Sequence, residues 1–234
     1  MNFSVKILFA VLTVGLITGC DDGRIYPDDE IAGGRQVSGT FRLTSLDAFP
    51  TGDQYQLVFA AFADGNEYPI TYRLLTKPTS ESAETEVTLG NVSENTAYVS
   101  LALIDKSKKL VYHFITSGVG SGESVVLPAE TVDLAGYSRL QQQIFTNQCL
   151  ACHGASNFTA AGLNLTATES YGMLVGVSST VNLSSLRVTP GNTNQSFLYR
   201  ILTVRESLDT DHTEMVDQED IDLLKCWIEN YCPE

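Results

Sequence analysis

One short motif constrains this chain more than any other feature, and it reads CLACH over residues 149–153. The spacing places two thiols one helical turn apart, so both can bond to the vinyl groups of one porphyrin while the following histidine lies beneath the iron. We predict one covalent haem c, held by thioether bonds from Cys149 and Cys152 and by His153 as an iron ligand. A redox dithiol belongs at a strand-to-helix junction, and a zinc site needs further ligands, so both are weaker alternatives.

The N-terminal nineteen residues have the pattern of an export signal. They read MNFSVKILFAVLTVGLITG, in which Lys6 precedes an apolar run that is too short for a membrane-spanning helix. The run ends in LITGC, which resembles the lipobox of bacterial lipoproteins. The resemblance implies cleavage before Cys20 and acylation of that cysteine, which would anchor the chain to the inner or outer membrane of the cell envelope. An ordinary signal peptide with a coincidental cysteine is the alternative.

The charge balance limits the kinds of partner. The 234 residues include 28 acidic and 14 basic side chains, which gives a net charge of −14. Such a surface repels nucleic acid, so we expect no nucleic-acid partner. A redox partner that is steered by charge would carry a basic surface.

The segment after the predicted signal divides into a tether and a β-rich region. Residues 20–36 are acidic, contain glycine and lack periodicity, which is typical of a solvated tether. Residues 37–134 alternate between apolar and polar positions and contain turn-rich breaks, which predicts an antiparallel β-sandwich domain. The seven expected strands are 38–45, 55–63, 68–76, 85–89, 96–105, 109–116 and 124–134.

Residues 135–234 have helical rather than strand periodicity. Residues 136–148 carry apolar side chains at helical spacing and run directly into the haem motif. Residues 217–231 repeat this pattern with acidic residues in the first turn, and Pro233 prevents continuation of the helix.

Several segments of this region resemble, in order, those of class I cytochrome c domains. They are IFTNQCLACHG, LNLTATESYGMLVGV, PGNTNQSFLYRIL and EDIDLLKCWIEN. The resemblance implies an all-α domain over 135–234 and a methionine ligand shortly before the last helix. Met215 is the matching residue, and its thioether would be the second axial ligand. His212, Met173 and an open site are the alternatives, and Val216 follows Met215 where the family commonly has proline.

Two further cysteines lie near the C-terminus. Cys226 and Cys232 are candidates for a disulfide in an oxidising compartment. In a continuous helix they would stand about 9 Å apart, whereas a disulfide needs less than about 7 Å, so pairing requires the helix to unwind near Asn230. Two unpaired thiols are the alternative.

Together these features predict a two-domain protein, an all-β antiparallel sandwich followed by an all-α class I cytochrome c domain. The predicted function is one-electron transfer by a membrane-anchored c-type cytochrome without catalytic residues, in contact with a redox partner protein. The alternatives are a haem-dependent enzyme, or a sensor or binding lipoprotein in which the sandwich binds a substrate or partner.

Overall fold

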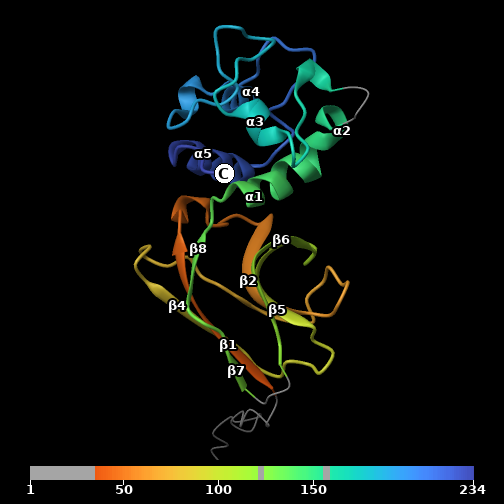
Figure 1. Ribbon diagram of the computed structural model, residues 1–234, viewed down its shortest axis with the longest axis vertical. Helices are drawn as coiled ribbons and strands as arrows, with labels where there is room; N and C mark the ends of the chain where they lie inside the picture. Colours follow the sequence, from red (N-terminus) through yellow and green to blue (C-terminus); the bar gives the residue numbers. More distant parts are fainter. Residues whose placement is uncertain (1–34, 121–123, 155–158) are drawn as a thin grey trace, which may run out of the picture. The chain divides into compact units, whose positions relative to one another are not determined.

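The computed structural model describes residues 35–120, 124–154 and 159–234. The predicted signal segment, Cys20 and most of the predicted tether lie outside these ranges. The described residues belong to one compact unit, Gly33–Glu234, whose strands precede its main helices along the chain (Figure 1). In this part of the chain, every helix is too short or too polar to cross a membrane.

The first sheet is built on β1 (Gln36–Thr44). This strand pairs antiparallel with β4 (Glu84–Leu89) and parallel with both β7 (Ser124–Val126) and β8 (Glu130–Asp133). Burial alternates along β1, with Phe41 among the residues that point into the core. This is the period of two expected for a strand that buries one face.

The second sheet contains β3 (Thr71–Leu74), β2 (Tyr55–Phe62), β5 (Tyr98–Asp105) and β6 (Leu110–Gly118), in that order. All its neighbouring strands are antiparallel. The two central strands, β2 and β5, are almost continuously buried, because apolar side chains cover both faces of the sheet. One face contributes to the main core, and the other carries a smaller cluster of Val58, Ala60, Phe62, Ala102 and Ile104.

The helix predicted over 136–148 is present, but most of it is π-helical. α1 (Tyr137–Leu140) continues directly into the π-helical η2 (Gln141–Cys149) and then into α2 (Leu150–His153). Widened π-helical turns frequently occur at functional sites, and this one ends on the first cysteine of the haem motif. The other elements are η1 (Leu46–Ala48), η3 (Ala160–Gly162), α3 (Ser170–Leu174), η4 (Thr193–Gln195), α4 (Phe197–Thr203) and α5 (Gln218–Glu229).

The last helix, α5, begins at a capping box. The side chain of Asp217 accepts a hydrogen bond from the backbone N–H of Asp220 at 3.1 Å, and the carboxylate of Asp220 accepts one from the N–H of Asp217 at 3.4 Å. This arrangement pairs backbone donors that a helix start otherwise leaves without partners. After Glu229 the chain reverses, with positive φ at Tyr231 and Cys232, so the helix stops before Pro233.

The predicted fold class, an all-β antiparallel sandwich followed by an all-α class I cytochrome c domain, is wrong. The N-terminal part does consist of two β-sheets, but they are not purely antiparallel. The first sheet is mixed, because the segment after residue 124 runs parallel to β1. The described C-terminal part has only short helices, which are connected by long irregular segments. Three isolated β-bridges also occur there, so it is not a clear all-α domain. Much of residues 175–196 is Ser, Thr, Asn and Gly, whose side chains and backbone favour turns over helix. The bridges are Val175–Val188, Ser178–Leu186 and Leu186–Ser196.

The boundary predicted at 134/135 falls where β8 leads into α1, but the main hydrophobic core is continuous across it. This core includes Phe41 and Leu101 from the sheets as well as Leu140 and Trp227 from the helices. The strands and helices therefore share buried apolar surface, and each contributes to the stability of the other.

The carboxylate of Glu219, in the first turn of α5, bonds directly to the chain that leads into β2. It accepts backbone N–H bonds from Gly52 at 3.0 Å, Gln54 at 3.1 Å and Tyr55 at 3.3 Å. A Cβ on Gly52 would lie 2.8 Å from this carboxylate, so a larger residue would displace the Glu219 side chain from these bonds. At the other end of the helix, the Asn230 side chain donates to Ser45 Oγ at 3.1 Å.

Candidate functional site

The two cysteines of the haem motif lie at the junction of η2 and α2. Cys149 is the last residue of η2 and Cys152 is the third residue of α2, so they are one helical turn apart. Residues with this separation lie on the same side of a helix. Cys149 is half-buried and packs against the main core, whereas Cys152 is exposed. A planar group bonded to both thiols would therefore contact the protein core near Cys149 and be exposed to solvent near Cys152.

The electrostatic environment of Cys149 differs from that of a reactive dithiol. Burial, with a smaller contribution from the nearby carboxylate of Asp220, raises the pKa of the Cys149 thiol to about 11. The nucleophilic cysteine of a redox dithiol has a lowered pKa, because a helix N-terminus or a nearby cation stabilises its thiolate. The first cysteine of this motif is therefore protonated at neutral pH, and it lacks the activation that thiol exchange requires.

His153 is held by hydrogen bonds to both its side chain and its backbone. Its Nδ1 lies 3.1 Å from the carbonyl oxygen of Leu163, and its own carbonyl accepts the N–H of Leu165 at 2.7 Å. A carbonyl partner requires the proton on Nδ1, so the lone pair of the ring is on Nε2. Burial lowers the pKa of His153, hydrogen bonds to the carbonyls of Leu163 and Ala160 oppose that shift, and the neighbouring His212 adds to it. The net lowering favours the neutral ring that binds metals.

A second histidine faces the first from the segment between α4 and α5. The ring centres of His153 and His212 are 6.5 Å apart, and the rings are inclined at 39°. Nδ1 of His212 is buried and has no hydrogen-bond partner among the described residues. Buried polar atoms without a partner are rare in folded proteins, so this nitrogen needs an explanation.

The two candidate methionine ligands have different environments. Met215 is 47% exposed, and its backbone N–H donates to the carbonyl of His212 at 3.1 Å, which makes the two residues part of one turn. Met173 lies in α3, and its sulfur accepts the backbone N–H of Asn164 at 3.2 Å. The structure therefore brings His212 towards His153, leaves Met215 at the surface beside it, and occupies the sulfur of Met173 with a backbone donor.

A buried polar network lies behind the haem motif. The carboxylate of Asp220 accepts hydrogen bonds from the side-chain amides of Gln143 and Gln148, both at 2.7 Å. Gln143 accepts a bond from Nε of Arg139 at 2.9 Å, so one amide connects a buried cation to a buried anion. Burial raises the pKa of Asp220, while the bonds from Gln148 and Gln143 oppose that shift. Because Gln148 directly precedes Cys149, the network fixes the turn that carries the first thiol.

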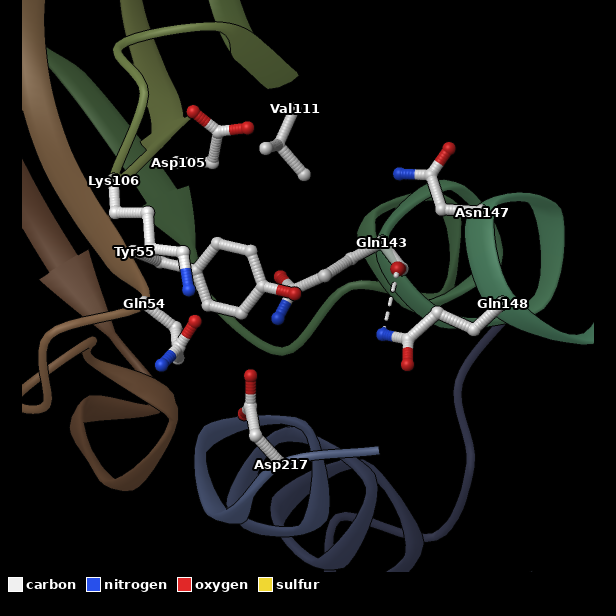
Figure 2. Close-up of a pocket in the computed structure, with 9 residues that line it drawn as sticks. All are labelled: Gln54, Tyr55, Asp105, Lys106, Val111, Gln143, Asn147, Gln148 and Asp217. Carbon is white, nitrogen blue, oxygen red and sulfur yellow. Dashed lines mark hydrogen bonds between the residues drawn. The ribbon is translucent and has the colours of Figure 1, made fainter. Parts of the chain in front are cut away.

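A cavity of about 290 Å³ lies beside this network and is lined mostly by polar residues. Figure 2 shows these residues. Tyr55 from β2 reaches into the cavity beside the amides of Gln143 and Gln148 from η2, and Asp217 faces them from the start of α5. Burial raises the pKa of Tyr55, and the nearby carboxylates of Asp220 and Asp217 raise it further. The phenol therefore stays protonated and can act as a hydrogen-bond donor to these acidic groups.

Sequence patterns did not identify Arg139, Gln143, Gln148 or Asp220 as parts of the site. The only available signal was the spacing of Arg139 and Gln143, which are four residues apart on one helix and therefore neighbours. Nothing in the sequence indicated that Asp220, more than seventy residues away, would join them.

The disulfide predicted between Cys226 and Cys232 is not formed in the structure, where both are free, buried thiols. The Asn230 side chain approaches Cys226 Sγ at 3.9 Å, and Cys232 Sγ approaches the carbonyl of Ile228 at the same distance. Burial raises the pKa of each of these thiols to about 11, so both are protonated at neutral pH.

In the described ranges, no three His, Cys, Asp or Glu side chains are grouped closely enough to bind a metal ion by themselves. A centre at the haem motif would thus combine a few protein ligands with atoms of a cofactor. No family model, curated protein or solved structure matches this chain.

Proposed function

We propose that this protein is a c-type cytochrome that carries one covalent haem and transfers single electrons in the cell envelope, to which a lipid on Cys20 anchors it. The observation that supports the proposal most directly is the placement of Cys149, Cys152 and His153 on one helical turn, with Nδ1 of His153 held by Leu163. The donor set fits the group, because two thiols and a neutral imidazole are what covalent haem attachment needs. The haem would supply an iron that gains and loses one electron.

The protein's own residues have separate tasks in this proposal. Cys149 and Cys152 hold the porphyrin through thioether bonds, so that it cannot dissociate. The carbonyl of Leu163 fixes the ring of His153 with Nε2 available to the iron, in the way that an outer partner orients a metal-bound histidine. The net charge of −14 favours a redox partner with a basic surface.

Haem attachment can be tested by counting covalent haem. Protein produced with c-type maturation enzymes is expected to contain one haem per chain that resists acid–acetone extraction, because the sequence has one C-x-x-C-H motif. The variant with both Cys149→Ser and Cys152→Ser should contain none, while Cys226→Ser, outside the motif, should keep the full amount. A pyridine haemochrome spectrum gives the count. Haem that extracts freely from the wild type would contradict the proposal.

The lipid anchor can be tested by fractionation. Cys20→Ala removes the acylation site but leaves the export signal in place, so the variant is expected to move from the membrane pellet to the soluble fraction. Cys226→Ser is again the matched control and should stay with the membranes. If Cys20→Ala still pellets after a high-salt wash, the attachment depends on another part of the protein.

A further inference from the structure

We propose that His212 is the second axial ligand of the haem iron, so that the iron is bound by two histidines. This inference rests on the proposed function, because it needs a haem held by Cys149 and Cys152. It differs from the ligand that the sequence resemblance implies, which is the thioether of Met215.

The first argument is the separation of the two rings. A metal lies about 2 Å from an imidazole nitrogen, so two imidazoles on opposite sides of one metal have ring centres roughly 6 Å apart. The ring centres of His153 and His212 are 6.5 Å apart, although 59 residues separate them in the sequence. That spacing lies within the range of ordinary aromatic contacts, and it also matches what a single shared metal requires.

The second argument is the unpartnered nitrogen of His212. Burial of a polar atom without a hydrogen bond is unfavourable, and a side chain can avoid that loss by turning towards solvent. His212 nevertheless keeps Nδ1 buried, even though it lies in an irregular segment between α4 and α5. A ring held in this position by a bond from its other nitrogen to iron would explain why Nδ1 is not rotated to water.

The third argument concerns the competing thioethers. The side chain of Met215 is 47% exposed. The sulfur of Met173 is already an acceptor for the N–H of Asn164. Met215 shares a turn with His212 through its N–H bond to the His212 carbonyl, yet only the His212 side chain lies against His153. In the structure, the ring of His212 lies beside His153, whereas the side chain of Met215 is exposed.

The spectrum of the ferric wild-type protein, with its covalent haem verified by pyridine haemochrome, tests the assignment. Two imidazole ligands should give a low-spin ferric spectrum that lacks the near-infrared sulfur-to-iron band. Met215→Ala should leave that spectrum and the midpoint potential unchanged. His212→Ala should lose the low-spin signal and bind carbon monoxide readily, and added imidazole should restore the wild-type spectrum.

The outcomes separate the two proposals. A wild type with covalent haem and a sulfur-to-iron band that Met215→Ala abolishes would overturn the assignment of His212 and leave the cytochrome proposal standing. A wild type without covalent haem would overturn both. Because the wild-type spectrum alone distinguishes nitrogen from sulfur, the result does not depend on whether His212→Ala folds.

Discussion

Replacement of Arg139 by methionine is expected to lower the free energy of unfolding by about 3–5 kcal/mol, because it removes the cation that balances the buried carboxylate of Asp220 and leaves buried carbonyl groups without a donor. Arg139 is 1% exposed, and its Nη1 donates to the backbone carbonyls of Ala48 at 2.9 Å and Leu134 at 2.7 Å. Burial lowers the pKa of Arg139 to about 10, so it remains a cation at neutral pH. Methionine has a comparable length but cannot satisfy these carbonyls or Gln143.

Urea denaturation followed by circular dichroism measures this loss. The matched control is Arg42→Met, since Arg42 makes only an exposed ion pair with Glu84 at 3.2 Å, and such pairs contribute at most about 1 kcal/mol. A double variant, Arg139→Met with Asp220→Leu, should be more stable than the sum of the two single losses predicts, because it buries neither charge alone. Strictly additive losses, or an Arg139→Met variant as stable as the control, would show that the two charges are not coupled.

Replacement of Trp227 by alanine is expected to cost about 3–5 kcal/mol, the usual cost of truncating a fully buried large aromatic side chain. Trp227 is 0% exposed and lies against Tyr137 and Tyr171, with ring centres 5.3 Å and 6.4 Å away. Its indole N–H also donates to the carbonyl of Pro233 at 2.9 Å, which holds the reversed chain after α5. The truncation therefore both leaves a cavity and releases that segment.

Trp227→Phe separates these two contributions, because it keeps most of the ring volume and removes the hydrogen bond to Pro233. The phenylalanine variant should lose clearly less free energy of unfolding than the alanine variant, as measured by thermal and urea denaturation. Tyr231→Ala, at a side chain that is 77% exposed, serves as the surface control and should be close to the wild type. If Trp227→Ala unfolds like Tyr231→Ala, the helical part does not depend on this aromatic cluster.

The strands could be predicted from sequence because their burial follows a period of two or forms continuous apolar runs. β1 and β5 lie within two residues of their expected bounds at each end. The pairing of the last β segment could not be predicted. The sequence of β7 and β8 does not indicate which strand they pair with, or whether the pairing is parallel or antiparallel. The strand predicted over 124–134 is two short strands, separated where Pro128 cannot donate to a ladder.

In the candidate site, the sequence predicted the local part and missed the distant part. The two cysteines and His153 lie in one pentapeptide, so their proximity needs no knowledge of the fold. The approach of His212 to His153 depends on the path of the irregular segment before α5, which has no periodicity to read. The burial of Arg139 could not be predicted from the sequence either, because arginine is ordinarily exposed. Its position is explained by the backbone carbonyls that accept its hydrogen bonds.

The bonds between α5 and the start of β2 also affect how fast the chain can fold. Glu219 and Gly52 are 167 residues apart, and Asn230 and Ser45 are 185 apart, so these contacts close very long loops. Contacts of such separation form late and slow the folding of a chain, because the entropy of loop closure is lost before the contact stabilises anything. The main core is complete only once the last helix has docked on the strands. Slow folding lengthens the time for which the pentapeptide with Cys149 and Cys152 is accessible to an enzyme that modifies the unfolded chain.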